Sequence, residues 1–312
     1  MSNLIRNRLF YALKPLIPRQ LQIALRRRDV LQKKIEYTDI WPIDEKAGTR
    51  PAGWAGWPEG KKFALVLTHD VDTAKGQGKC LDLVGMEESL GFKSSFNFVP
   101  ERYNVSSDLR TSLVRRGFEV GVHGLRHDGK YFVSKKVFRE RAARINSYLK
   151  EWDAVGYRSP SMQYNLEWFH DLDIEYDAST FDTDPFEPQP EGMRTIFPFW
   201  VQGKGPRDGY IELPYTLPQD FTLFVLMKEK TLDIWKRKLD WVAKKGGMAL
   251  LNTHPDYQCF DLPRPGREEY PARLYDEFLG YVREYYKDKY WHALPREAAR
   301  FWAEKHGRSA AF

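Results

Sequence analysis

Short apolar segments alternate with amphipathic ones along the middle of the chain, and this alternation constrains the fold more than any other feature. The predicted strands are 63–68, 93–99 and 118–122, and the predicted helices between them are 79–90 and 108–116. Gly91 and Gly117 directly follow the two helices, as is typical of helix C-termini. Strands that alternate with helices in this way predict an α/β fold built on a parallel sheet.

The same rhythm continues towards the C-terminus. Ser134 is a suitable N-cap for a helix whose apolar residues recur at spacings of three and four, namely Phe138, Ala142, Ile145, Leu149 and Trp152. Further strands are predicted at 154–157, 173–177, 210–213 and 248–252, with a helix from Thr231 to Gly246 and a helical region at about 270–306. The whole segment therefore predicts one continuous α/β domain.

Composition limits the class of protein. The 312 residues, 42% of them hydrophobic, suffice for a large core, and the two cysteines, Cys80 and Cys259, lie too far apart for a cysteine metal module. No apolar run approaches the ~18 residues of a membrane span, and no export signal is recognisable. We expect a cytoplasmic protein with an extension and connector at 1–59 and the α/β domain at 60–312.

The positive charge is concentrated at the N-terminus. Residues 1–34 contain nine Lys or Arg and one acid, whereas the remainder contains 40 bases and 42 acids. This distribution argues against a nucleic-acid-binding face on the domain. Because the basic residues are mixed with apolar ones, the segment predicts peripheral contact with the anionic inner face of a membrane. An arm that packs on its own domain remains the alternative.

Two carboxylates follow the first predicted strand. Residues 68–72 read Thr-His-Asp-Val-Asp, and we expect Asp70 and Asp72 to lie in the loop beyond the strand end, because a buried strand does not readily carry two ionised groups. The carboxyl ends of parallel strands are where α/β folds place their chemistry. The alternative is a solvated turn that happens to contain two Asp residues.

A pair of histidines follows the third predicted strand. His123 and His127 are four residues apart, so their imidazoles can converge on one point in a helical turn or tight loop. With a carboxylate they would make a three-ligand metal site with an open position, and Asp72 is the natural third ligand. The helical His-Glu-x-x-His protease motif is excluded because residue 124 is Gly.

Three more polar residues occupy predicted strand ends. Arg158 could hold a carboxylate in bidentate geometry or form a salt bridge at the rim. Asp177 is either functional or a turn acid. His254 stands before Pro255, and a titrating imidazole there could serve as a general acid.

These motifs, taken in order, resemble those of the polysaccharide deacetylases, the nodulation-type deacetylase domain of carbohydrate esterase family four. The similar segments are 68–72, 123–127, 158–160 and 254–255. The resemblance implies a distorted β/α barrel of about seven parallel strands. It also implies removal of acetyl groups from an N-acetylated sugar, with a divalent metal, Zn²⁺ first and Co²⁺, Ni²⁺ or Fe²⁺ as other choices. The implied metal ligands are Asp72, His123 and His127.

The resemblance also assigns roles, with one departure. The family commonly has two adjacent acids in its first motif, base and then ligand, whereas Val71 separates them here, so the ligand role moves to Asp72. Asp70 is then the general base, Arg158 orients it, and His254 is the general acid. Asp177 matches an acidic position that tunes a catalytic residue, although the tryptophan often found after it is absent. Glu212 also lies in a similar strand end and has no assigned role.

Two other functions stay open. A metal-dependent hydrolase of the same fold could act on another non-peptide C–N bond, such as that of a cyclic ureide. A non-catalytic membrane-binding or glycan-binding scaffold is disfavoured, because the set of predicted site residues is intact. Four aromatic residues could form a stacking wall for a sugar ring, namely Tyr164, Trp168, Trp200 and Tyr215.

Overall fold

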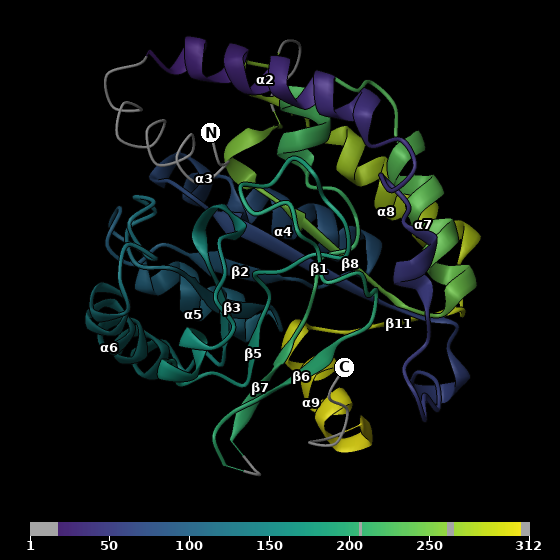
Figure 1. Ribbon diagram of the computed structural model, residues 1–312. Coiled ribbons are helices and arrows are strands. Elements are labelled where there is room, and N and C mark those ends of the chain that lie inside the picture. Colours follow the sequence, from purple (N-terminus) through teal and green to yellow (C-terminus); the bar gives the residue numbers. More distant parts are fainter. Residues whose placement is uncertain (1–17, 206–207, 261–264, 307–312) are drawn as a thin grey trace.

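The computed structural model describes residues 18–205, 208–260 and 265–306, which form a curved parallel sheet surrounded by helices (Figure 1). The main sheet has the order β11-β1-β2-β3-β4-β5-β7-β6, and β8 pairs with β1. Its strands are β1 (Phe63–Val71), β2 (Ser95–Phe98), β3 (Glu119–His123), β4 (Gly156–Arg158), β5 (Tyr176–Asp177), β6 (Phe199–Gln202), β7 (Gly209–Glu212), β8 (Met248–Thr253) and β11 (Tyr290–His292). Paired strands are parallel except that β6 is antiparallel to β7. A small separate sheet consists of β9 (Gln258–Cys259) and β10 (Tyr270–Pro271).

The sheet curls into a distorted barrel. An isolated parallel bridge joins Leu217, in the segment after β7, to Leu251 in β8. Because β8 also pairs with β1, seven strands follow one another around the barrel: β1, β2, β3, β4, β5, β7 and β8. The predicted fold class, a distorted barrel of about seven parallel strands, is therefore confirmed, with β6 and β11 as additional strands.

The helices cover the outside of the sheet. They are α2 (Arg19–Glu36), α3 (Ala74–Gly78), α4 (Cys80–Leu90), α5 (Ser107–Arg115), α6 (Lys135–Trp152), α7 (Asp233–Lys245), α8 (Arg273–Tyr285) and α9 (Pro295–His306). A π-helix, η6, spans Phe221–Leu226, and short 3-10 turns are η2 (Glu45–Gly48), η3 (Pro58–Gly60), η4 (Pro160–Met162), η5 (Trp168–Asp171) and η7 (Pro255–Tyr257). None of the helices in the described ranges is long and apolar enough to span a bilayer.

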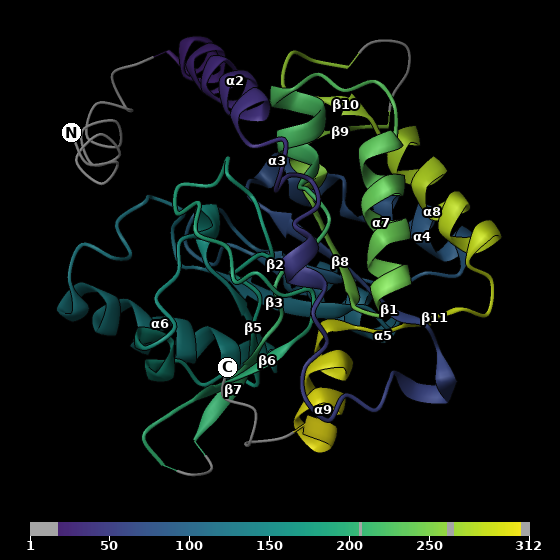
Figure 2. The same ribbon diagram turned by 45° about the vertical axis from the view of Figure 1, so that its right-hand side comes forward.

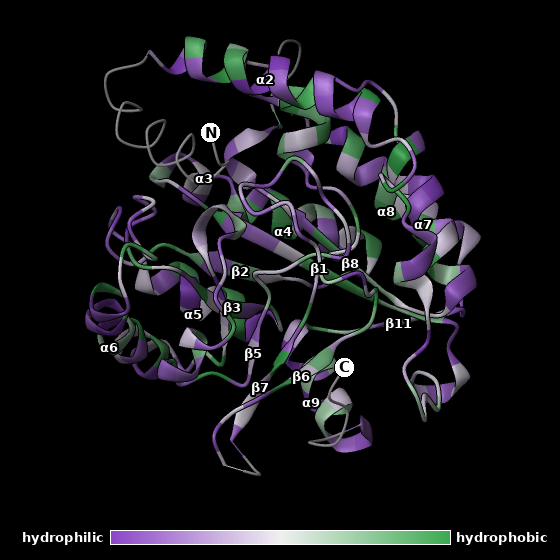
Figure 3. Cartoon of the chain, viewed as in Figure 1, coloured by the Kyte–Doolittle hydropathy of each residue, from purple (hydrophilic) through white to green (hydrophobic). Residues whose placement is uncertain are grey.

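Several boundaries agree with the sequence because local chemistry sets them. The Ser134 side chain accepts a hydrogen bond from the Val137 N–H at the start of α6, and all five residues of the apolar stripe of that helix are buried. Gly91 and Gly246 adopt left-handed backbone conformations after α4 and α7. Figure 3 shows apolar and polar stretches within the strands, and every residue of β1 is buried, including the polar ones near its end.

Two elements differ from expectation. β1 continues through Asp70 to Val71, so Asp70 lies inside the strand and not in the loop beyond it. The region at 270–306 is not all helical, because β11 interrupts it. β2 pairs with β1 only from Thr68 onwards. The earlier residues 63–65 of β1 pair with β11 on that side. Without β11, the backbone groups of these residues would lack hydrogen-bond partners there.

The N-terminal helix α2 lies against η6, and Figures 1 and 2 both show it beside that helix and above α3. Its buried residues include Ile23 and Val30. The Arg27 side chain donates hydrogen bonds to the carbonyls of Val225 and Leu226. This part of the basic segment thus packs on the domain, while residues 1–17 of that prediction lie outside the described residues. The domain boundary near residue 60 stays a prediction.

Candidate metal centre

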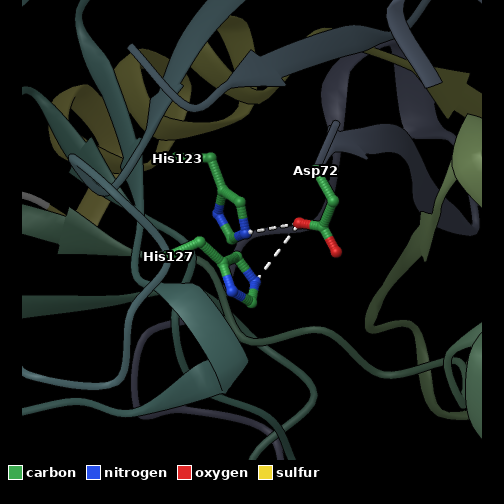
Figure 4. Close-up of side chains that lie close together, drawn as sticks. All are labelled: Asp72, His123 and His127. Carbon is green, nitrogen blue, oxygen red and sulfur yellow. Dashed lines mark ion pairs between the residues drawn. The ribbon is translucent and has the colours of Figure 1, made fainter. Parts of the chain in front are cut away.

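Three side chains of the kinds that bind metal ions converge at the carboxyl ends of two strands. Asp72 directly follows β1, His123 is the last residue of β3, and His127 lies in the loop after β3. One donor atom from each lies within 4.8 Å of the others. The Asp72 Oδ1 is 3.4 Å from His123 Nε2 and 3.3 Å from His127 Nε2, and Figure 4 shows the imidazoles facing the carboxylate. The structure thus brings the three predicted ligands together.

The loop after β3 explains how two histidines four residues apart converge. Gly124 and His127 both have positive φ angles, of 62° and 53°, so the chain reverses tightly between them. A side chain at residue 124 would be strained at this φ and would also collide with the ring of Pro160. The Gly in this motif therefore permits the turn that brings His127 back beside His123.

The donor set fits a divalent cation. Asp72 Oδ1 is a buried oxygen without a hydrogen-bond partner among the described residues, although it faces two imidazoles. The Nδ1 of His123 lies 3.1 Å from the Arg158 carbonyl oxygen, and donation to that oxygen leaves the Nε2 lone pair directed at Asp72. Burial lowers the pKa of His127 to about 4, although the negative charge of Asp72 acts to raise it. This imidazole is therefore also neutral. One carboxylate and two neutral imidazoles are a typical ligand set for such an ion.

Asp70 is held next to this centre as an ionised carboxylate. Asn97 donates to its Oδ1 at 3.0 Å and Asn252 donates to its Oδ2 at 2.8 Å. Burial alone would raise the pKa of Asp70, but neighbouring positive charges, those of Arg158 and His254 among them, outweigh it and lower the pKa to about 2. These partners are the reason why a buried strand can carry this charge.

Arg158 is completely buried and reaches Asp70 through one nitrogen, Nη1, at 3.3 Å. The contact is therefore not the bidentate clamp that the sequence suggested. The same Nη1 donates to Thr68 Oγ1 and to Asn252 Oδ1, and Nε donates to the Ala178 carbonyl. Arg158 is thus fixed by three other groups and acts on Asp70 mainly through its charge.

His254 is paired with an acid that the sequence analysis missed. The Nδ1 of His254 lies 2.7 Å from Asp220 Oδ1, and the His254 backbone N–H donates to Asp220 Oδ2 at 2.8 Å. Burial would lower the pKa of His254, but the carboxylate of Asp220 outweighs it and raises the pKa to about 10. The imidazole is therefore protonated at neutral pH. Its charge also helps to lower the pKa of Asp70 and of Asp72.

Asp177 lies apart from this centre. It accepts hydrogen bonds from the backbone and side chain of Ser179, and burial raises its pKa. Glu212, next to it, accepts from the backbone and side chain of Thr180, and burial raises its pKa well above the usual range. Among the described contacts, neither carboxyl group touches Asp70 or His254. That Asp177 tunes a catalytic residue stays a prediction, and no direct contact with Asp70 or His254 among the described residues supports it.

Four residues around the centre were not singled out from the sequence: Asn97, Asp220, Asn252 and Asp256. Asp256 accepts a hydrogen bond from the Asp72 backbone N–H at 2.9 Å and another from the Thr73 hydroxyl, which fixes the backbone that carries Asp72. Asn252 and Asp256 flank the His254-Pro255 motif, so their positions could have suggested them. Asn97 and Asp220 lie in apolar surroundings in the sequence, with no pattern that marks them.

The four aromatic residues proposed as a sugar wall do not gather at the centre. Tyr215 is 1% exposed, the Tyr164 hydroxyl donates to the Glu191 carbonyl, Trp168 packs against Phe132 and Phe138, and Trp200 lies on β6. The aromatic side chain beside His254 is instead Tyr257, with 5.3 Å between the ring centroids. Sequence position alone could not distinguish it among so many aromatic residues.

No protein-family model matches the chain, and no curated protein does. Solved structures do match. A protein assigned as a polysaccharide deacetylase from Mycobacterium smegmatis has 21% identity and a TM-score of 0.63, over 82% of this chain and 96% of its own. One from Pseudomonas aeruginosa PAO1 has 17% identity and a TM-score of 0.61, over 80% and 94%. PuuE allantoinase has 15% identity and a TM-score of 0.64, over 80% and 93%.

At these identities the similarity concerns the fold. It extends over nearly the whole length of the matched proteins and over about four fifths of this chain. The chain therefore has the fold of the polysaccharide deacetylases, which an allantoinase shares.

Proposed function

We propose that the protein hydrolyses the acetamide of an N-acetylated sugar with the help of a divalent metal and releases acetate and a free amine. The observation that carries this proposal is the convergence of Asp72, His123 and His127, with one carboxylate oxygen lacking any other partner in the described chain. Asp70 and His254 supply an ionised carboxylate and a protonated imidazole beside it. Such a pair suits acid–base hydrolysis of an amide, whose leaving group is poor without a proton.

The roles follow from the charge state of each side chain. A divalent metal bound by the three ligands would polarise the acetyl carbonyl and lower the pKa of water. Asp70, which is ionised, accepts the proton of the attacking water, while Asn97 and Asn252 keep its oxygens in position. His254, which is protonated, donates its proton to the departing nitrogen. The acyl group thereby gains the hydroxyl group of the water, and the amine gains a proton.

The metal we propose is Zn²⁺, because one carboxylate and two imidazoles with an open position are a common catalytic zinc set. Co²⁺, Ni²⁺ and Fe²⁺ accept the same nitrogen and oxygen donors, and metal availability decides among them. The site holds too few oxygen ligands for Ca²⁺, which prefers six to eight.

A second candidate function is hydrolysis of a different non-peptide C–N bond. The similarity to PuuE allantoinase, with a TM-score of 0.64, favours it as much as the similarity to the deacetylases favours the first candidate. Both reactions need an activated water, a base and a proton donor, so the three-ligand centre alone does not separate them.

We also propose that the protein is cytoplasmic and docks on the anionic inner face of a membrane through its N-terminal segment. The outward face of α2 carries four large apolar side chains, Leu21, Leu25, Leu31 and Ile35, which are 50%, 46%, 43% and 78% exposed. The excess of basic residues in 1–34 complements an anionic lipid surface. A helix with this outward face can lie in the interface plane.

The test of the enzymatic proposal is acetate release from a panel of N-acetylhexosamine carriers, measured on the full chain with metal, after chelation and after metal is restored. We expect acetate from at least one carrier, loss of activity with chelator and recovery with Zn²⁺. A cyclic ureide is assayed in parallel for ring opening. Ring opening without acetate release would select the second candidate, and activity that is indifferent to chelation would contradict both.

A further inference from the structure

A row of rings leads from the predicted general acid to helix α2. The His254 ring lies 5.3 Å from the Tyr257 ring, and the Tyr257 ring lies 4.7 Å from that of Phe221. The Arg26 guanidinium of α2 lies over Phe221, 5.1 Å from its centroid. Phe221 also directly follows Asp220, the partner of His254. The rings of Phe221 and Tyr257 thus connect a cation of the N-terminal helix to the predicted acid, although Arg26 lies more than 220 residues before His254 in the chain.

A second set of contacts relates Arg26 to the predicted base. The charge of Arg26 acts on Glu187, whose Oε1 accepts a hydrogen bond from Gln219 Nε2 at 2.7 Å. Gln219 Oε1 in turn lies 3.3 Å from Asn252 Nδ2, which also donates to Asp70. The charge of Arg26 therefore acts on one end of the polar network that holds Asp70, and its guanidinium contacts the row of rings that leads to His254.

Arg26 does not attach α2 to the domain. Other cations of this helix do so: Arg19 binds Glu268, Arg27 donates to the Val225 and Leu226 carbonyls, Lys33 donates to the Pro185 carbonyl, and Lys34 binds Glu229. In the described part of the chain, the Arg26 guanidinium makes no hydrogen bond or ion pair and only the ring contact. The side chain is half-buried. No described residue therefore takes up its donors.

Glu187, the carboxyl group on which the charge of Arg26 acts, does not neutralise this arginine. Burial, reinforced by the charge of Asp184, raises the pKa of Glu187 to about 8. Glu187 is therefore mostly protonated at neutral pH, and it does not balance the positive charge of Arg26.

We propose that Arg26 binds an anionic group, a phosphate or a carboxylate, that the substrate carries beyond the sugar bearing the acetamide. Helix α2 is then one wall of the substrate site. This inference rests on the proposed function and names the class of its substrate: an N-acetylated sugar with an attached anion.

The chemistry of the side chain suits this role. A guanidinium presents paired donors that match the oxygens of a phosphate or carboxylate, and contact with an aromatic face limits its freedom before the ligand arrives. Charge-assisted hydrogen bonds of this kind contribute a factor of roughly 10 to 100 in affinity. A neutral sugar would gain nothing from them.

The test measures binding and turnover separately on the metal-loaded full chain. The probes are N-acetylglucosamine, N-acetylglucosamine 1-phosphate and the uronate of N-acetylglucosamine, titrated calorimetrically into the wild type and into Arg26→Gln, Arg26→Lys and Arg28→Gln. Arg28 is the matched control, because it is an exposed arginine on the outward face of the same helix. Acetate release is then followed with the same compounds.

We expect the wild type to bind at least one anionic sugar about 10-fold or more tighter than the neutral sugar. Arg26→Gln should abolish this preference, Arg26→Lys should retain part of it, and Arg28→Gln should leave it unchanged. Which anionic sugar is preferred identifies the group as phosphate or carboxylate. The inference is overturned if Arg26→Gln keeps the preference, if it weakens the neutral and anionic sugars equally, or if the wild type shows no preference.

Failure of the proposed function gives a different result. If the anionic preference depends on Arg26 but no compound releases acetate, the anion site stands and the deacetylase proposal fails. If acetate is released equally from neutral and anionic sugars, the deacetylase proposal stands and the inference about Arg26 is wrong.

Discussion

The Nδ1 of His254 lies 2.7 Å from the Oδ1 of Asp220, a residue 34 positions earlier in the chain. The same carboxylate accepts hydrogen bonds from the His254 backbone and from the Tyr270 hydroxyl, so its orientation is fixed from three directions. Asp220 thereby holds one ring nitrogen of His254 and leaves the other for a substrate.

Replacement of Asp220 should change the pH profile of the enzyme. Because the carboxylate raises the pKa of His254 to about 10, the acid form is complete at neutral pH and activity should fall only as the pH rises through about 10. In Asp220→Asn, the alkaline limb of kcat/KM should move several pH units lower, with the metal content unchanged. Asp82→Asn, an exposed acid on α4, is the control. An alkaline limb at the same pH in Asp220→Asn would contradict the assignment.

Removal of the imidazole itself should slow the reaction without loss of metal. His254→Ala lacks the proton donor, and general acid catalysis typically contributes about 10² to 10⁴ in rate. Turnover should fall by that factor, while metal per chain, measured by elemental analysis, stays at the wild-type level. A metal-free His254→Ala protein would place His254 among the ligands.

Gly124 should be required for the metal centre because of its backbone conformation. Gly124→Ala places a side chain at a φ of 62° and against the Pro160 ring, which costs about 1 to 3 kcal/mol and displaces His127. We expect a lower free energy of unfolding and at least ~10-fold weaker metal binding. Gly85→Ala in α4 is the control, since open space surrounds that position. It should be neutral or slightly stabilising.

The local elements could be predicted because their signals are local. The stripe of α6, its Ser134 cap and the glycines after α4 and α7 depend on residues a few positions apart, and the structure confirms them. β11 could not be predicted, because it forms to pair with residues 63–65, more than 200 positions away. Periodicity carries no information about such a partner.

The residues of the candidate site also fall into two groups, those marked by a local sequence pattern and those brought in only by the fold. Asp72, His123 and His127 stand in motifs with recognisable spacing, and the structure brings them together. Asp220 and Asn97 reach the centre only through tertiary packing, and a single Asp or Asn within an apolar segment has no distinctive pattern. A general rule about buried charge predicts that Asp70 lies in a loop. The rule fails here because the side chains that stabilise this carboxylate lie on other strands.

Membrane docking through α2 should depend on its outward apolar side chains. Leu25→Glu combined with Ile35→Glu removes apolar area and adds negative charge, so partition onto anionic vesicles should fall by about 10-fold or more. The control is Val114→Glu, at an exposed apolar position on α5. Co-sedimentation measures the bound fraction of the full chain. Equal partition of the double variant and the wild type would show that this face does not contact the membrane.

The proposed mechanism is tested most directly by separating the roles of Asp70 as the base and Asp72 as a metal ligand. These two residues are where this sequence departs from the common motif. The measurement is bound metal per chain and turnover for Asp70→Asn and Asp72→Ala after identical metal loading, with folding checked by circular dichroism. We predict that Asp70→Asn keeps its metal and loses most of kcat, because the base is gone, and that Asp72→Ala loses both metal and activity. An Asp70→Asn protein without metal, beside an Asp72→Ala protein that is loaded and active, would show that the two roles are reversed.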